Sequence, residues 1–400
     1  MPCAQGSLPP PGKTGPSGAR PTLMGLTRFL HTADWHLGMT RRFLPPEAQA
    51  RYSGDRIDAV AQIARMADEV DAQFVLVCGD VFDSNHVDRQ VVARAASALA
   101  QFTVPVLILP GNHDPLDAAS VYRAPVFVDR LPASVTVIED STPILIGDVE
   151  VVGAPWNAKR PGLDPSASVV AGLGPAGSLR VLAAHGVVDV MSPDTQDPSV
   201  IAMSGLRTAL DAGLLAYVAL GDRHSTTEVG GDPRVWYPGT PVATDHGELD
   251  PGNVLIVSID KTGVGVEPRS VGQWSFRRVE ARLDGVDDVA RLDAELAAIP
   301  NKDRTVVRLS LVGALGMSED AELHRALDDH RDVFASLTTS DGRSDLAVFV
   351  EESDLQHLGL QGYAHAAAAE IAESASTPGP DQQAARDALR LLYRLTRGAA

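Results

Sequence analysis

The sequence predicts an α/β fold in which two packed sheets are flanked by helices, followed by a smaller α+β domain and a terminal helix. Three observations lead to this prediction. Apolar runs of strand length alternate with stretches of helical periodicity from Thr27 to about Asp260. The later runs of that region have few helical stretches between them, which suggests a second sheet packed on the first. A smaller strand and helix pattern follows over 276–350.

The elements of the larger region follow from this alternation. The expected strands are Thr27–His31, Phe74–Cys78, Val106–Leu109, Val135–Ile138, Val149–Val152, Arg180–Ala184, Tyr217–Leu220 and Val254–Ile259. Helical periodicity appears over Ala48–Val70 and Val87–Gln101. Residues 261–275 are expected to form a turn and a strand that lead out of this region.

The smaller region is expected to contain two strands and two helices. They are strand Ser275–Ala281, helix Val286–Ala298, strand Thr305–Leu311 and helix Ala321–His330. Residues 374–382 are rich in Ser, Pro and Gly and are expected to be a linker. An amphipathic helix is expected over Gln383–Arg397, and it could dock on a partner or pack on its own domain.

These patterns divide the chain into four parts. Residues 1–25 are rich in Pro, Gly and Ser and lack the apolar segment of a secretory signal, so we expect a disordered tail. Met24 lies just before the first strand and could be the natural start. Residues 26–273 are expected to form one large domain, residues 274–350 a smaller domain, and residues 351–400 a linker with a C-terminal helical segment.

Composition excludes several classes of protein. Hydrophobic residues make up 44% and charged residues 22%, which is ordinary for a soluble globular protein. No uncharged apolar run reaches the roughly 18 residues of a membrane-spanning helix. With only Cys3 and Cys78, a disulfide framework is excluded and a reducing, cytoplasmic compartment is expected. Because the net charge is −18, contact with nucleic acid would need a local basic surface or a partner.

Polar clusters directly follow five of the expected strands. They are Asp34-Trp35-His36, Gly79-Asp80-Val81-Phe82-Asp83, Gly111-Asn112-His113-Asp114, His185 and Gly221-Asp222-Arg223-His224. Ligands of open α/β folds bind outside the carboxyl ends of strands, so these clusters predict one converging site. Each cluster alone is compatible with a turn or a helix cap. The succession of all five is what indicates function.

The residue types of these clusters indicate metal chemistry. Asp, His and Asn without a thiolate suit a hard or borderline divalent metal such as Mn²⁺, Fe²⁺ or Zn²⁺. The clusters offer enough ligands for two ions that share a bridging carboxylate. Two-metal sites serve phosphoryl transfer because they hold both the attacking and the leaving oxygen.

The same series of clusters resembles the calcineurin-like metallophosphoesterase superfamily. Stretches similar to SbcD-type DNA exonuclease subunits are His31–Gly38, Gly79–Asp83, Pro110–Asp114 and Tyr237-Pro238-Gly239-Thr240-Pro241. The likeness covers about residues 27–260 and is vaguer over 276–400, where such proteins carry a capping domain and a helical segment that docks an ATPase. It implies a two-sheet metallophosphoesterase sandwich with a C-terminal capping domain.

The resemblance also implies a role for each site residue. One ion would be held by Asp34, His36, Asp80 and His224, and the other by Asp80, Asn112, His185 and Asp222, with Asp80 as the bridge. Two Mn²⁺ ions are expected, with Mg²⁺, Fe²⁺ or Zn²⁺ as alternatives. His113 would face the scissile phosphate and stabilise charge or protonate the leaving oxygen. Asp114 could orient the His113 imidazole or serve the turn.

One motif departs from the family pattern. The usual Gly-His-x-His is replaced by Gly221-Asp222-Arg223-His224. A carboxylate still binds Mn²⁺ or Mg²⁺, but it adds negative charge and should shift the second site toward harder ions or weaken it. Arg223 could pair with Asp222 or reach a substrate phosphate.

The resemblance implies a dinuclear-metal phosphodiesterase, specifically a DNA exonuclease or endonuclease subunit acting in DNA repair and recombination with an SbcC-type coiled-coil ATPase. A homodimer is left open. The alternatives are a small-molecule phosphodiesterase or phosphatase, favoured by the acidity and the altered last motif, and a catalytically weak scaffold. Basic residues that could contact DNA phosphates, or belong to solvated loops, are Arg41, Arg42, Arg51, Arg56, Lys159 and Arg160.

Overall fold

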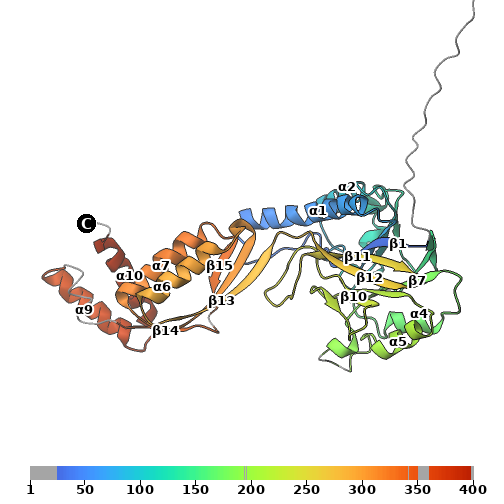
Figure 1. The fold of residues 1–400 in the computed structure, drawn as a ribbon. Helices are drawn as coiled ribbons and strands as arrows, with labels where there is room; N and C mark the ends of the chain where they lie inside the picture. The colour runs from blue at the N-terminus through green and yellow to red at the C-terminus, as the bar shows by residue number, and fades with distance from the viewer. Residues whose placement is uncertain (1–24, 193, 195, 341, 350–359, 398–400) are drawn as a thin grey trace, which may run out of the picture.

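The larger part of the chain is built from two six-stranded sheets that pack against each other (Figure 1). The computed structural model describes residues 25–192, 194, 196–340, 342–349 and 360–397. The first sheet has the order β12-β11-β1-β2-β3-β4, with β1 to β4 parallel and β11 and β12 antiparallel at one side. Strand β11 pairs antiparallel with β1, and β12 pairs antiparallel with β11. The strands of this sheet are β1 (Thr27–Thr32), β2 (Val75–Cys78), β3 (Val106–Leu109), β4 (Val135–Val137), β11 (Asn253–Asp260) and β12 (Gly263–Ser270).

The second sheet has the order β5-β6-β7-β8-β10-β9. Its strands are β5 (Ile144–Ile146), β6 (Val149–Gly153), β7 (Leu179–His185), β8 (Tyr217–Gly221), β9 (Thr227–Glu228) and β10 (Val235–Tyr237). The four inner strands are parallel, whereas β5 and β9 pair antiparallel at the two edges. The parallel strands of both sheets therefore deliver their carboxyl ends to one side of the sandwich.

Helices cover the outer faces of both sheets. On the first sheet, α1 (Pro46–Glu69) and α2 (Arg89–Leu99) enclose a core that includes Val75 and Val77, whereas Leu76 points into the core between the sheets. The continuous apolar run of β2 reflects this burial on both faces. The remaining helices are α3 (Pro125–Val128) beside α2, and α4 (Pro165–Ala171) and α5 (Met203–Asp211) on the second sheet.

The C-terminal part contains a four-stranded parallel sheet with the order β13-β14-β15, in which β16 also pairs with β14. Its strands are β13 (Ser275–Leu283), β14 (Thr305–Gly316), β15 (Ser336–Thr339) and β16 (Asp345–Phe349). One face packs on α6 (Val286–Ala298) and α7 (Met317–Arg331). The last helices, α9 (Tyr363–Ser376) and α10 (Gln382–Arg397), pack on each other and on α7 through Ala372, Ala385 and Leu389.

Helix α1 reaches from the first sheet to the C-terminal part (Figure 1). The Asp55 carboxylate accepts hydrogen bonds from Trp274 Nε1 and Arg304 Nε, both at 2.8 Å. On the same turn of the helix, Arg56 is buried and donates to the carbonyl oxygen of Trp35 at 2.6 Å, and Tyr52 donates to the carbonyl oxygen of Ala243 at 3.0 Å.

The predicted fold class is confirmed, and every strand expected over 27–260 is observed. The prediction missed the short strands β5, β9, β10, β15 and β16 and the helices α3, α4, α5 and α9. The expected linker 374–382 begins inside α9. The terminal helix packs on α9 and α7, and its docking on a partner stays a prediction. The expected tail and Met24 fall on residues 1–24, outside the described residues. No helix within the described part is long and apolar enough to cross a membrane.

Candidate metal centre

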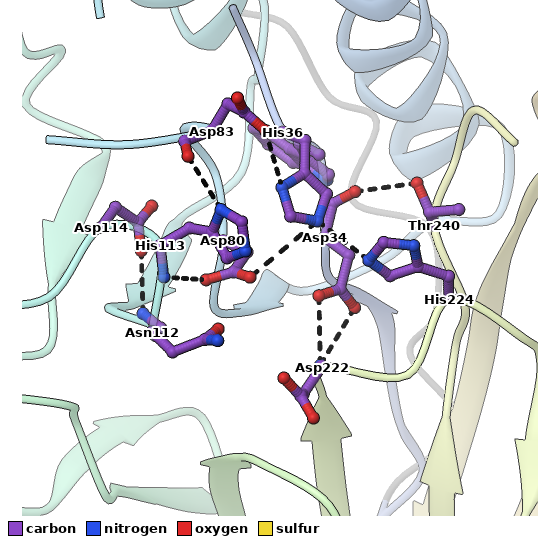
Figure 2. Close-up of polar contacts among 12 residues, drawn as sticks. Asp34, His36, Asp80, Asp83, Asn112, His113, Asp114, Asp222, His224 and Thr240 are labelled. Carbon is purple, nitrogen blue, oxygen red and sulfur yellow. Dashed lines mark hydrogen bonds and ion pairs between the residues drawn. The ribbon is translucent and has the colours of Figure 1, made fainter. Parts of the chain in front are cut away.

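The side chains of the five polar clusters converge at the carboxyl ends of β1, β2, β3, β7 and β8 (Figure 2). The backbone there turns abruptly, since Asp34, His36, Asp80 and Asp222 have φ values of 56°, 44°, 54° and 97°. Left-handed conformations are unfavourable for residues other than glycine and concentrate at functional sites, where the surrounding structure enforces them. The strained turns aim four predicted ligands at one place.

Two glycines allow this close approach. A β-carbon at position 111 would lie 2.2 Å from Asp80 Oδ1, and one at position 221 would lie 1.7 Å from the carbonyl oxygen of Cys78. The glycines of the Gly-Asn and Gly-Asp pairs are therefore required by packing around the ligands.

The first group of ligand atoms belongs to Asp34, His36 and His224, which lie within 4.8 Å of one another. The Nε2 atoms of His36 and His224 are 2.9 Å apart. The Asp80 carboxylate approaches from the side, with its Oδ2 atom 3.9 Å from His36 Nε2. The four predicted ligands of the first ion are thus brought together.

The second group surrounds Nε2 of His185. This atom lies 2.9 Å from Asn112 Oδ1, 3.5 Å from Asp80 Oδ1 and 3.6 Å from Asp222 Oδ1. Asp80 therefore faces both groups, as a bridging ligand must. The Asp222 carboxylate stands where the resemblance places a histidine, and its backbone N–H donates to both Asp34 oxygens at 3.1 and 3.2 Å.

Two histidines of the site, His185 and His224, are oriented through their Nδ1 atoms. His185 Nδ1 donates to the carbonyl oxygen of Cys78 at 2.8 Å, and His224 Nδ1 lies 2.9 Å from Glu248 Oε1. Such partners fix the tautomer that leaves Nε2 free to bind a metal. The Nδ1 atom of His36 lies 3.5 Å from Asp83 Oδ1 without a hydrogen bond between them. No role was predicted from the sequence for Glu248 or Asp83.

Two residues of the stretch 237–241 form hydrogen bonds to loops that carry predicted metal ligands. The Thr240 hydroxyl donates to the carbonyl oxygen of Asp34 at 2.8 Å (Figure 2). The Tyr237 hydroxyl donates to the carbonyl oxygen of Gly186 at 2.7 Å. Both side chains are buried and fix the loops that carry ligands.

The electrostatics of the cluster fit a cation. Burial raises the pKa of Asp34 to about 7, against the opposing effect of His224 and His185, and it also raises the pKa of Asp222. Burial lowers the pKa of His36 to about 4, so this ring is neutral and able to coordinate. Within the described part of the chain, no Lys or Arg pairs with Asp34, Asp80 or Asp222. Buried carboxylates of this kind are stabilised by metal ions.

His113 and Asp114 lie beside the cluster but have different hydrogen-bond partners. His113 Nδ1 donates to the carbonyl oxygen of Asp83 at 2.8 Å, so Nε2 is left to exchange a proton. Asp114 is fully buried and accepts from the backbone N–H groups of Gly111 at 2.8 Å and Phe82 at 3.0 Å. The expected orientation of His113 by Asp114 is therefore wrong. Asp114 serves the turn, the other role considered.

The basic residues fall into different surroundings. Arg42 is exposed, and Arg41 is half-buried with its backbone N–H bonded to Gln49. Arg223 Nε donates to Thr227 Oγ1 at 3.1 Å rather than to Asp222, and the contact with a substrate phosphate stays a prediction. A DNA contact by Arg56 is excluded because the guanidinium is buried among the oxygens of Trp35 and Tyr52. Arg51 is engaged by Glu47 and Asp303.

A model of the calcineurin-like phosphoesterase family matches residues 27–210. This part of the chain is similar to that family. The match spans the clusters from Asp34 to His185, and the phosphoesterase fold continues to the last cluster, at the end of β8. The family uses a dinuclear divalent metal centre, and the ligand groups described above are arranged for one.

Three curated relatives are DNA repair or nuclease proteins by name. The DNA double-strand break repair protein Mre11 of Haloferax volcanii is 24% identical over 87% of this chain and 79% of its own length. The SbcD component of the nuclease SbcCD of Rhodobacter capsulatus is 25% identical over 68% of this chain and 85% of its own. The same component of the Bacillus subtilis nuclease is 31% identical over 23% of each chain. The likeness to SbcD-type proteins noted from the motifs is confirmed at low identity.

Proposed function

We propose that this phosphoesterase is a two-metal phosphodiesterase that cleaves DNA. The observation that carries the proposal is the convergence of seven Asp, His and Asn side chains, presented by both sheets, around the shared Asp80 carboxylate. The names of the relatives support DNA as the substrate. We further propose Mn²⁺ as the ion, because the second group combines two carboxylates with one imidazole.

In this proposal Asp34, His36, Asp80 and His224 would hold one ion, and Asp80, Asn112, His185 and Asp222 the other. When bound, two divalent ions supply Lewis acidity and neutralise the negative charge of a phosphodiester. His113 is the proposed general acid, since its Nδ1–H is committed to the Asp83 carbonyl and only Nε2 can exchange a proton. Arg41 and Arg42, which follow the first metal loop, and Arg223, beside Asp222, are proposed to contact substrate phosphates.

The remaining assignments are also proposals. Residues 26–273 would form the catalytic domain, 274–350 a cap and 351–400 the helical segment that docks an SbcC-type coiled-coil ATPase. The protein would act in DNA repair and recombination in the cytoplasm, as a monomer or homodimer beside its ATPase. The relative named as part of the nuclease SbcCD supports this partnership.

The test uses end-labelled double- and single-stranded DNA with Mn²⁺, an EDTA control and the variant His113→Ala. Cleavage that needs metal and is lost in the variant would support the proposal. His86→Ala is the matched control, since His86 is exposed. Hydrolysis of a small aryl phosphodiester without DNA cleavage would replace DNA by a small-molecule substrate, which the carboxylate at position 222 also allows. Inactivity on both substrates would favour a scaffold.

A further inference from the structure

A cleft of about 520 Å³ opens directly beside the candidate metal centre. Asn112 and Asp222, from the second group of ligands, line one end of it. Trp156, Lys159 and Arg160 line a wall that comes from the loop after β6. A volume of this size is within the range of sites that bind small organic ligands or a nucleotide. The cleft is thus continuous with the place where the scissile phosphate would bind.

Two cations in this cleft are available to a ligand. Lys159 and Arg160 are both exposed, and within the described ranges neither makes a hydrogen bond or a close ion pair. The facing carboxylate of Asp197 accepts from the backbone N–H and the hydroxyl of Ser199 at 2.9 and 2.7 Å, and Arg160 is close enough to lower its pKa further. Asp222 belongs to the metal centre. Apart from the proposed metal ligand Asp222, the lining of the cleft therefore carries two cations and one carboxylate.

The wall of the cleft is fixed relative to the metal centre. Trp156 is almost fully buried, and its Nε1 donates to the carbonyl oxygen of His185 at 2.6 Å. Its ring meets the His185 ring edge-on at a centroid distance of 5.8 Å. Trp156 therefore holds the start of the loop that carries Lys159 and Arg160 against His185 of the second ligand group.

We propose that this cleft is a subsite for the phosphate next to the scissile one, with Lys159 and Arg160 as its ligands. The inference rests on the proposed function and deepens it. A substrate with successive phosphates, an oligonucleotide strand, would engage the metal centre and the cleft together. A simple phosphodiester would engage the metal centre alone. Arg and Lys pair strongly with phosphate oxygens, so the cleft would select a nucleic-acid strand over a small diester.

The experiment compares thymidine dinucleotides with and without a terminal phosphate, at the 5′ or the 3′ end, and an aryl phosphodiester. The proteins are the wild type, Lys159→Ala/Arg160→Ala, and the control Arg65→Ala/Lys261→Ala, which removes the same charge from exposed positions elsewhere. We measure kcat/KM with Mn²⁺ and, separately, equilibrium binding with Ca²⁺. One terminal phosphate should strengthen wild-type kcat/KM and binding by about 10–100-fold, and the double variant should lose this gain while keeping aryl diester hydrolysis.

The kinetic and the binding measurements together distinguish failure of the subsite from failure of the proposed function. Equal affinity of the wild type for dinucleotides with and without the terminal phosphate would overturn the subsite, as would a gain that survives in the double variant. A wild type that hydrolyses nothing would overturn the proposed function. In that case the binding arm still decides the subsite, because it requires no turnover.

Discussion

The hydrogen-bond partner of His224 offers a sharp test of the metal centre. Glu248 is nearly buried, with its side chain 7% exposed. Its Oε1 atom is 2.9 Å from His224 Nδ1 and also accepts from the Thr244 hydroxyl, and its Oε2 accepts from the Thr244 N–H at 2.8 Å. All three partners donate. Glu248→Gln keeps the shape of the side chain but replaces one accepting oxygen by an NH₂ group.

The amide cannot satisfy these donors in either orientation. If NH₂ faces the Thr244 N–H, a buried donor loses its acceptor, at a cost of about 1–3 kcal/mol. If NH₂ faces His224, the ring must accept at Nδ1 and carry its proton on Nε2, which removes the lone pair that binds metal. Replacing the partner of a metal-bound histidine commonly weakens metal affinity by about 10–100-fold, which agrees with that cost.

The assay is calorimetric titration of the metal-free protein with Mn²⁺. We expect Glu248→Gln to weaken the binding of one ion by about 10–100-fold and DNA cleavage to recover at higher Mn²⁺. Glu267→Gln is the control, since Glu267 forms an exposed ion pair with Arg269 on β12. Unchanged affinity of both Mn²⁺ ions in Glu248→Gln would refute the reasoning.

Three further predictions follow from other buried groups. Burial lowers the pKa of His31 to about 3, so the unfolded chain binds a proton below pH 6.5 that the native protein does not. The free energy of unfolding should thus fall by up to about 1.4 kcal/mol per unit as pH drops from 6.5, less steeply in His31→Gln, and equal slopes in urea titrations would contradict this. Gly221→Ala should lower the melting temperature and weaken Mn²⁺ binding, because the new β-carbon meets the carbonyl that orients His185. Gly54→Ala, in open space on α1, should instead stabilise by up to about 1 kcal/mol. Asp222→His should shift the ratio of Zn²⁺ to Mn²⁺ affinities toward Zn²⁺, and an unchanged ratio from competition titrations would show that this side chain is no ligand.

The positions of the candidate ligands could be predicted because each follows a buried strand directly. A strand such as Val106–Leu109 is read from its apolar run, and the next polar residues then occupy the carboxyl end of the sheet. Short edge strands such as Thr227–Glu228 were missed, since their pairing depends on neighbours rather than on their own composition.

Contacts across loops could not be read from the sequence. Glu248 lies in an unpatterned loop, and only the folded chain shows that it meets His224. Arg56 is on a helix whose pattern does not reveal that the guanidinium is buried over the Tyr52 ring. Asp114 accepts from Gly111 and Tyr122, so hydrogen bonds to neighbouring residues take the carboxylate away from His113.

One turn of α1 connects the C-terminal part of the chain to two loops at the candidate metal centre. On one side, Asp55 accepts hydrogen bonds from Trp274 and Arg304. On the other side, Arg56 donates to the carbonyl oxygen of Trp35, and Tyr52 donates to that of Ala243. Trp35 separates two ligands, and Ala243 precedes the threonine that bonds Glu248. A shift of the C-terminal part relative to α1 would therefore be transmitted to the loops of Trp35 and Ala243 through these few hydrogen bonds.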